Sequence, residues 1–217
     1  VPERAMIYFE KSGYFNTSRA CEVNNHVSNY LRIVMDEKQI DGTFSSNSGS
    51  NLMLNNGISL NLPSNSYTYS DGSTYYGDIN VSVNKISPEG PNFSMRIPGG
   101  DLRATRTNGD DRRLYSYGMI DVVLTGDNGE SINTIPGSNT QIRMPIADNM
   151  IADAPNEIPL WHYDDLTGIW VEEGIATKSG NEYIGNVSHF SYWNWDVPSE
   201  EAGVYGIVLD CEGSPIA

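Results

Sequence analysis

Short runs in which apolar residues alternate with polar ones constrain the fold of this chain more than any other feature of its sequence. In an extended strand successive side chains point to opposite faces, so a period of two gathers the apolar ones on one buried face. No stretch carries the 3.6-residue period of an amphipathic helix. We predict strands at residues 5–10, 30–35, 58–63, 79–84, 119–124, 140–145, 160–163, 168–172, 183–187 and 204–209.

The turns between these runs predict how the strands pair. Asn-Gly or Asp-Gly dipeptides, which favour tight hairpins, begin at residues 56, 71, 108 and 128. Strands of this length and spacing are typical of an all-β fold, and we predict an antiparallel β-sandwich. The lack of helical patterns between the strands argues against a parallel α/β sheet.

The charge balance narrows the class of partners. Lys and Arg number 13 and Asp and Glu number 28 in 217 residues, a formal net charge of −15. Because basic patches are needed to neutralise phosphates, we expect no nucleic-acid partner and no docking on anionic membranes. No apolar run approaches the roughly 18 residues of a membrane span, so we expect no membrane insertion. A hydrophobic content of 38% is sufficient for a core.

Two composition shifts suggest domain boundaries. A Gly/Ser/Asn-rich stretch at residues 41–51 and a Pro-containing acidic stretch at residues 196–203 are both predicted to be linkers or long loops. They divide the chain into a fragment at 1–41, a central sandwich at 42–196, and a tail at 197–217 made of a linker and the first strand of a following module. We expect the chain to be a piece of a longer protein, since it begins with Val1.

The two cysteines, Cys21 and Cys211, lie near opposite ends of the chain. Two unrelated thiols and one disulfide that joins the ends are both compatible with these positions, because sequence alone does not place them within bridging distance. A disulfide would imply an oxidising compartment. The acidic, Asn- and Ser-rich composition with few lysines is typical of extracellular proteins.

Several motifs follow one another in an order that resembles a known family. They are residues 57–63 (GISLNLP), 96–101 (RIPGGD), 158–163 (IPLWHY) with 168–170 (GIW), and 186–195 (NVSHFSYWNW). Over residues 46–196 this order resembles the ZU-type β-sandwich of ankyrins, netrin receptors and zonula-occludens proteins. The layout also resembles modules of large bacterial surface proteins and of cartilage intermediate layer proteins. Residues 10–15 and the strand after them resemble the last strands of a carboxypeptidase-regulatory-like sandwich, so the resemblance implies that 1–41 is the end of such a module. Residues 204–216 resemble the first strand of the next one.

The last motif resembles the end of the ZU-type domains in autoproteolytic death-domain and inflammasome proteins, in which the chain cuts itself between Phe and Ser. The resemblance implies cleavage between Phe190 and Ser191. Attack of the Ser191 hydroxyl on the adjacent carbonyl closes a five-membered ring, so its effective molarity is high. His189 is the candidate base, since residues two apart in a strand share a face. An ordinary final strand with Phe190 in the core is the alternative.

Other candidate sites are weaker. Carboxylates at residues 110–111, 127–130 and 164–165 offer the oxygen ligands that Ca²⁺ prefers, although solvated turns explain them as well and we assign no cofactor. We expect no zinc site, because His26, His162 and His189 lack a metal-binding spacing. The four tryptophans are candidates either for a sugar-stacking platform or for the core, and alternation within strands favours the core. They are Trp161, Trp170, Trp193 and Trp195.

Together these observations predict an extracellular structural or adhesive module of a larger secreted or cell-surface protein, with self-cleavage at Phe190–Ser191 as the more specific hypothesis. Its expected partners are neighbouring β modules of the same chain and a protein or glycan ligand. The alternative is a glycan- or protein-binding module that does not cleave. The chain is expected to be at most an intramolecular autoprotease, and a hydrolase that turns over external substrates ranks third.

Overall fold

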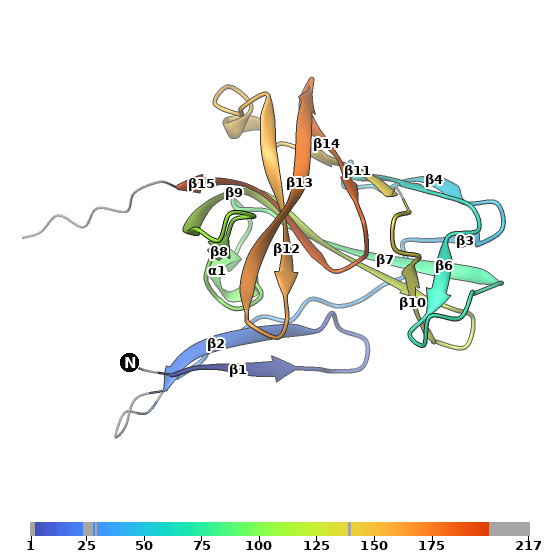
Figure 1. Ribbon diagram of the computed structural model, residues 1–217, viewed down its shortest axis with the longest axis horizontal. Helices are drawn as coiled ribbons and strands as arrows, with labels where there is room; N and C mark the ends of the chain where they lie inside the picture. Colours follow the sequence, from blue (N-terminus) through green and yellow to red (C-terminus); the bar gives the residue numbers. More distant parts are fainter. Residues whose placement is uncertain (1–2, 24–27, 29, 139, 200–217) are drawn as a thin grey trace, which may run out of the picture.

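The computed structural model describes residues 3–23, 28, 30–138 and 140–199, and these residues form a nearly all-β structure (Figure 1). The prediction of an all-β, antiparallel fold is confirmed. One four-residue helix, α1 (Phe93–Arg96), and one 3-10 turn at Asp148–Met150 interrupt the strands. The strands are β1 (Glu3–Phe9), β2 (Thr17–Val23), β3 (Gly42–Ser45), β4 (Ser50–Met53), β5 (Ser59–Leu62), β6 (Tyr67–Tyr69), β7 (Asp78–Ile86), β8 (Arg103–Thr105), β9 (Asp111–Thr125), β10 (Ser131–Thr134), β11 (Thr140–Pro145), β12 (Glu157–Asp164), β13 (Ile169–Ser179), β14 (Glu182–Val187) and β15 (Tyr192–Ser199).

The larger sheet runs in the order β3-β7-β9-β15-β12-β13-β14-β11-β5-β4 and folds over on itself, so that β12, β13 and β14 cross β7 and β9 (Figure 1). Its named pairs are antiparallel except β8 with β13. The buried core cluster draws on both halves of the fold. It includes Leu60 of β5, Ile79 of β7, Val122 of β9, Ile142 of β11, Leu160 of β12, Tyr183 of β14 and Trp195 of β15. The hydrophobic core therefore lies inside the folded sheet.

The four tryptophans are fully buried. The Trp161 indole donates a hydrogen bond to the Asp196 carbonyl oxygen at 2.9 Å, and that of Trp193 donates to the His189 carbonyl oxygen at 2.9 Å. The interpretation of these residues as a sugar-stacking platform is wrong, because stacking needs an exposed ring face. Burial of large aromatic surfaces is instead a main source of the stability of the sandwich.

Two local predictions are wrong. Residues 30–35 form no strand, and the Val34 amide donates a hydrogen bond to the carbonyl oxygen of Met95 in α1 at 3.0 Å. An apolar run becomes a strand only when a neighbour completes its hydrogen-bond ladder. Conversely, residues 41–51 are not a linker, because they contain β3 and the start of β4. β3 pairs with β7, and its Phe44 is buried. The strand predicted at 204–209 lies outside the described residues.

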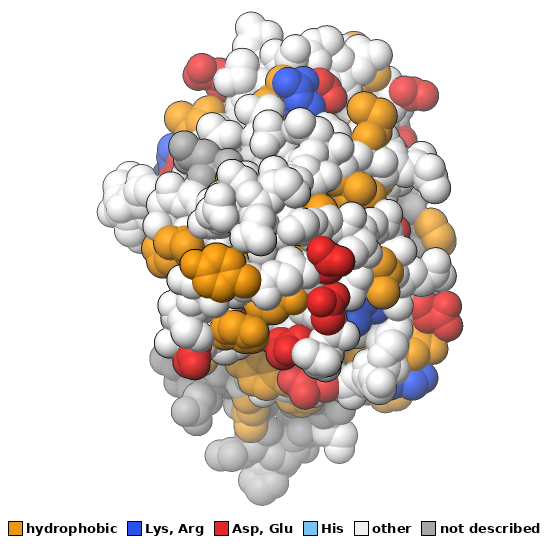
Figure 2. All heavy atoms as spheres, turned by 90° about the vertical axis from the view of Figure 1, so that its right-hand side faces the viewer, with side chains coloured by type: hydrophobic (Ala, Val, Ile, Leu, Met, Phe, Trp, Pro, Cys, Tyr) orange, Lys and Arg blue, Asp and Glu red, His pale blue; other side chains and the backbone are white. Residues whose placement is uncertain are grey.

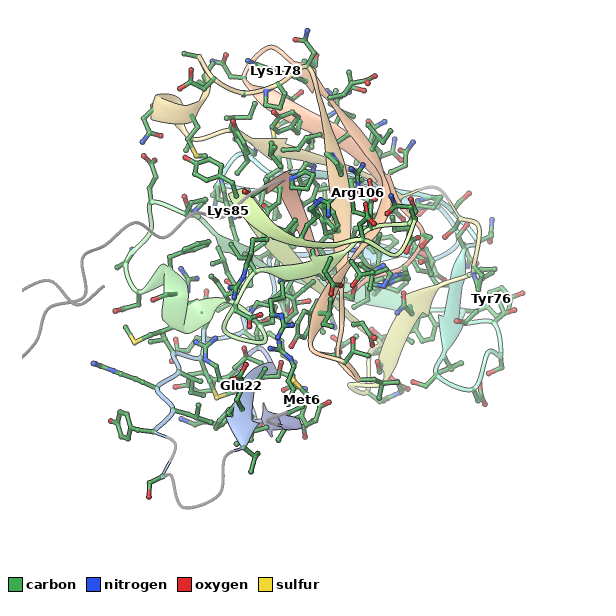
Figure 3. The ribbon with its side chains drawn as sticks, turned by 60° about the vertical axis from the view of Figure 1, so that its left-hand side comes forward. Met6, Glu22, Tyr76, Lys85, Arg106 and Lys178 are labelled. Carbon is green, nitrogen blue, oxygen red and sulfur yellow. The ribbon has the colours of Figure 1, made fainter. Side chains whose placement is uncertain are left out.

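The β1–β2 hairpin packs against one end of the folded sheet (Figure 1). Arg4 forms an ion pair with Asp101 at 3.0 Å and donates a hydrogen bond to the Gly168 carbonyl oxygen at 2.8 Å. Met6 projects from the hairpin (Figure 3) and packs against a second core cluster, which includes Trp161, Tyr163 and Trp170. At Gly168, where φ is +68°, an added Cβ atom would overlap the Met6 sulfur. Residues 3–23 thus share a packed interface with the central strands.

The division into three parts at 41 and 196 stays a prediction. The hairpin lies on the sandwich, and β15 continues through Ser199, three residues past the second proposed boundary. Acidic side chains gather in the lower half of the face shown in Figure 2, as the net charge leads one to expect. Among the described residues, no helix is long and apolar enough to cross a membrane.

Arg19 is the residue whose loss is expected to loosen the hairpin most. It is 6% exposed and donates hydrogen bonds to the carbonyl oxygens of Ile97 and Ser94. Arg19→Ala should destabilise the fold by about 1–3 kcal/mol, since it leaves buried acceptors unpaired. Hydrogen exchange of the Ala20 amide, which donates to the Gly99 carbonyl oxygen at 2.9 Å, reports the loss locally. Unchanged exchange, or equal acceleration in the exposed control Arg113→Ala, would contradict this role.

Candidate functional site

The His189-Phe190-Ser191 motif lies in the bent connection between β14 and β15. The prediction that it forms an extended strand is wrong, and the argument that His189 and Ser191 share a face therefore does not hold. The reason is topological. β14 pairs with β11 and β13, whereas β15 pairs with β9 and β12, so the chain must leave one part of the sheet and cross to another at this point.

One side chain holds both polar groups of the Phe190 backbone. Asn133 Oδ1 accepts a hydrogen bond from the Phe190 amide at 3.0 Å, and its Nδ2 donates to the Phe190 carbonyl oxygen at 3.3 Å. Next to it on β10, the Thr134 hydroxyl donates to the Ser188 carbonyl oxygen at 3.2 Å. A donor on the carbonyl of the expected scissile bond is what a developing oxyanion requires. No motif in the sequence links Asn133 to this site, because it lies 57 residues before Phe190.

The side chains of His189 and Ser191 face different hollows. Ser191 and the buried Phe190 line a pocket of about 350 Å³ that also includes Asp121 and Tyr192. The Ser191 hydroxyl donates a hydrogen bond to the carbonyl oxygen of Tyr192 at 3.3 Å. His189 lines a separate hollow that includes Asn133. The structure thus brings Asn133 to Phe190, but it directs the imidazole of His189 elsewhere.

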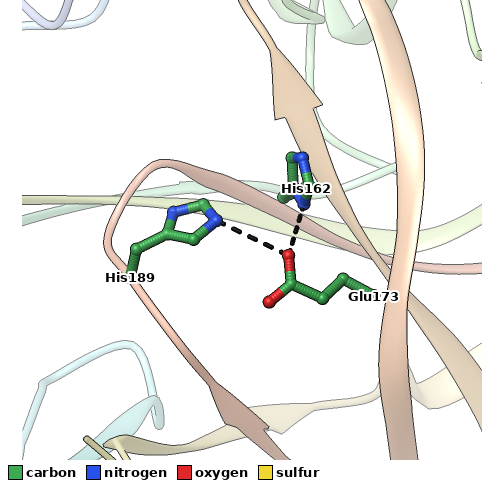
Figure 4. Close-up of side chains that lie close together, drawn as sticks. All are labelled: His162, Glu173 and His189. Carbon is green, nitrogen blue, oxygen red and sulfur yellow. Dashed lines mark ion pairs between the residues drawn. The ribbon is translucent and has the colours of Figure 1, made fainter. Parts of the chain in front are cut away.

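The His189 imidazole instead joins Glu173 of β13 and His162 of β12 (Figure 4). Glu173 Oε2 lies 2.8 Å from His162 Nδ1 and 3.7 Å from His189 Nε2. The strands explain the first contact: His162 pairs with Val171, so Glu173 is its diagonal neighbour on the same face. His162 Nδ1 and Glu173 Oε2 lie at ion-pair distance. Nevertheless, His162 Nδ1 is buried and the geometry is not that of a well-directed hydrogen bond.

Neighbours hold this cluster in place. The Ser188 hydroxyl donates a hydrogen bond to Glu173 Oε1, which leaves Oε2 toward the two imidazoles. The buried Trp193 ring lies 5.1 Å from that of His189 and 5.8 Å from that of His162, and the two imidazoles are 5.1 Å apart. Edge and tilted contacts of this kind restrict ring orientation. The side chains of His162, Glu173 and His189 are 21%, 38% and 35% exposed.

Glu173 and His189 both have shifted pKa values. Burial lowers the pKa of His189, the charge of His162 lowers it further, and Glu173 partly offsets both effects. Burial acts to raise the pKa of Glu173, but the Ser188 hydrogen bond and the two histidines outweigh it, so this pKa lies below its ordinary value. An ionised Glu173 therefore faces a neutral His189.

The pocket beside Ser191 contains a buried acid. Burial, together with the charge of Asp165, raises the pKa of Asp121 to about 7. Tyr192, which pairs with Asp121 across β15 and β9, donates its phenolic hydrogen to the Asn16 carbonyl oxygen at 2.8 Å. Burial raises the pKa of Tyr192 as well, followed by the charge of Asp121. Nothing in the period-two pattern marks Asp121 as special, since it occupies an ordinary polar position within a strand.

The loop carboxylates considered for Ca²⁺ bind groups of their own turns. Asp110 pairs with Arg112 at 3.1 Å, Glu130 accepts hydrogen bonds from Asn128, and Asp164 accepts one from the Thr167 hydroxyl at 2.6 Å. Among the described residues, His162, Glu173 and His189 are the group of His, Cys, Asp and Glu side chains that brings three potential metal ligands together. The expectation based on histidine spacing missed this group, because β12 and the β14–β15 connection meet only in the folded chain.

Two further sequence-based candidates involve residues outside the described part of the chain. Cys21 lies half-buried in β2, whereas Cys211 is not described, so their pairing stays a prediction. His26, the third histidine, is not described either.

Comparison with known proteins gives distant relatives. No family model matches the chain, and no solved structure matches it. It is 31% identical over 121 residues to cartilage intermediate layer protein 1 of Sus scrofa, a match that covers 53% of this chain and 19% of that protein. It is 30% identical over 128 residues to cartilage intermediate layer protein 2 of Mus musculus, covering 56% of this chain and 10% of the relative.

The matches cover only a small fraction of each relative's length, so the similarity concerns only that part of the relative. The human cartilage intermediate layer protein 1 is 29% identical over 121 residues, with 10% of its length covered. The chain therefore corresponds to a small part of each relative. The likeness to ZU-type domains stays a prediction, because the comparisons do not name that domain. What is shown is a β-rich chain that is distantly similar, over about half its length, to cartilage intermediate layer proteins.

Proposed function

We propose that this chain is an extracellular structural module of a larger secreted or cell-surface protein. The observation that carries the proposal is the similarity over 121 residues to cartilage intermediate layer protein 1, whose name places it in a layer of cartilage. The folded sheet, the docked hairpin and the acidic surface support a rigid, solvated unit. Neighbouring modules of the same chain are its expected partners.

Localisation of the full-length protein tests this proposal. Intact cells that make the protein are treated with a protease that does not cross membranes, and the released peptides and the medium are analysed by mass spectrometry. Peptides of this chain should be recovered without lysis, as should those of a known surface protein. A known cytosolic protein is the negative control. Recovery of peptides of this chain only after lysis, as for that cytosolic protein, would overturn the proposal.

We propose as a second function that the chain cleaves itself between Phe190 and Ser191. The Asn133 clamp on the Phe190 backbone favours it. In the first step a bond forms from Ser191 Oγ to the Phe190 carbonyl carbon, the C–N bond breaks, and the hydroxyl proton passes through a base to the leaving amine. Water then hydrolyses the resulting ester, leaving a carboxylate on Phe190. His189, the base expected from the sequence, must turn away from Glu173 to take this part.

Asn133→Ala should slow cleavage by a factor on the order of 10²–10³, the usual cost of losing one oxyanion donor. The chain is incubated at neutral pH, and its intact mass under denaturing conditions is followed for a fragment that begins at Ser191. Ser191→Ala should yield no fragment. Asn128→Ala, a substitution of an exposed turn residue, is the matched control and should cleave like the parent chain. A single intact mass of the parent chain after prolonged incubation would refute self-cleavage.

A further inference from the structure

The strongest unassigned feature of the molecule is the cluster of His162, Glu173 and His189 (Figure 4). It joins β12, β13 and the β14–β15 connection, three segments that are separate in sequence. The ligand atoms are His162 Nδ1, Glu173 Oε2 and His189 Nε2, and all lie within 4.8 Å of one another. Two imidazole nitrogens and one carboxylate oxygen form a donor set typical of zinc sites that keep a fourth position open.

We propose that this cluster binds a divalent transition metal ion of the zinc type. Zn–N and Zn–O bonds of about 2.0–2.2 Å in a tetrahedron place neighbouring ligand atoms roughly 3.3–3.6 Å apart. The distances from Glu173 Oε2 are 2.8 Å to His162 Nδ1 and 3.7 Å to His189 Nε2, on either side of that value. The two imidazole nitrogens lie within 4.8 Å of each other, so changes of side-chain torsion that draw them toward Glu173 Oε2 would bring the three atoms to ligand spacing.

Three features of the surroundings suit a metal. His162 Nδ1 is buried and faces Glu173 Oε2 at 2.8 Å, although the geometry is not that of a well-directed hydrogen bond. Ser188 binds Glu173 Oε1, the oxygen that would not coordinate the ion, and such outer partners orient ligating carboxylates. The ring of Trp193 contacts both imidazoles and restricts their rotation. The site is thus preorganised by groups that are not ligands themselves.

The open fourth position lies near the solvent, since each of the three side chains is partly exposed. An ion held there would link β12, β13 and the β14–β15 connection at the point where the chain crosses between parts of the sheet. The proposal does not rest on self-cleavage, because none of the three ligand atoms belongs to Phe190 or Ser191. Occupancy by a metal would instead withhold the His189 imidazole from any role as a base.

Metal titration of the tag-free chain tests the proposal. After treatment with a chelator and its removal, ZnCl₂ is added in a calorimeter at neutral pH, and CoCl₂ is added in parallel while visible absorption is recorded. We expect one Zn²⁺ per chain and the intense visible bands of tetrahedral Co²⁺, which Zn²⁺ abolishes by displacement. Ca²⁺, which prefers six to eight oxygen ligands, should not compete. No saturable binding of Zn²⁺ at a one-to-one ratio would overturn the proposal.

Variants locate the site. His162→Gln, Glu173→Gln and His189→Gln should each weaken Zn²⁺ binding at least about tenfold. The matched controls are Glu172→Gln, which removes the adjacent carboxylate on β13, and His26→Gln, which removes the third histidine; both should bind like the parent chain. Circular dichroism checks that each variant is folded, and Ser191→Ala is titrated to separate binding from cleavage. Unchanged affinity in the three cluster variants, or loss in either control, would overturn the assignment.

Discussion

The free energy of unfolding should fall as the pH rises from about 4 to about 8. Burial raises the pKa of Asp121 to about 7 and that of Asp196 to about 8, whereas an unfolded Asp titrates near 3.9. Between these values the folded chain holds protons that the unfolded chain has released, so the slope of stability with pH is negative. Each group contributes up to about 1.4 kcal/mol per pH unit within its window, as an upper order of magnitude.

The surroundings of the two acids explain the sign. Asp196 Oδ2 accepts a hydrogen bond from the Asn194 amide, while Oδ1 is buried and meets no partner among the described residues. Asp121 faces the charge of Asp165, which opposes ionisation, and that of Lys38, which favours it less strongly. A carboxylate in such a setting is more stable protonated than ionised.

Urea unfolding measured at pH 5 and at pH 8 checks this expectation. Asp121→Asn and Asp196→Asn should each flatten the pH dependence, because an amide does not titrate. Asp127→Asn, on an exposed turn, is the control and should keep the slope of the parent chain. A parent chain that is equally stable at both pH values, or more stable at pH 8, would contradict the buried protonated state of these acids.

Replacement of Trp161 by Phe should destabilise the fold more than replacement of Trp195 by Phe, by about 1–3 kcal/mol. Both side chains are fully buried, so both lose similar ring volume. The Trp161 indole, however, donates a hydrogen bond to the Asp196 carbonyl oxygen, and its loss leaves a buried acceptor short of a partner. The Trp195 indole nitrogen is buried and meets no acceptor among the described residues, so Phe at that position also removes an unpaired donor.

The free energies of unfolding of the two variants, compared at one pH, decide the matter. Trp195→Ala is a reference variant that shows how much the whole buried side chain contributes at that position. It should lower the free energy of unfolding by roughly 3–5 kcal/mol, because it leaves a cavity. An equal cost for Trp161→Phe and Trp195→Phe would mean that the hydrogen bond to Asp196 contributes nothing to the folded state.

Strands in which apolar and polar residues alternate were the part of the fold that the sequence predicted best. The runs at 79–84 and 119–124 lie within β7 and β9, where one face packs into the core. The strands that escaped prediction, such as β2 and β10, carry few apolar residues and exist because a neighbour pairs with them. For short polar strands, pairing in the tertiary structure decides more than local propensity.

The candidate site was predictable only in part. The motif at 189–191 can be recognised in the sequence, but its bent conformation depends on β14 and β15 pairing with different strands. Asn133, Glu173 and His162 could not be assigned to it, because they come from other strands and no spacing rule links them to residue 189.

The sequence by itself determined the all-β class, the acidic surface and the burial of alternating aromatics, because period, charge and hydrophobicity are properties of the residues. The tertiary structure alone decided that residues 42–45 and 50–51 lie in strands and that residues 30–35 do not, since ladder hydrogen bonds need a partner. It also decided that Asn133 holds Phe190 and that His162, Glu173 and His189 meet. Contacts between residues far apart in the chain arise only when the sheet folds over and closes its core.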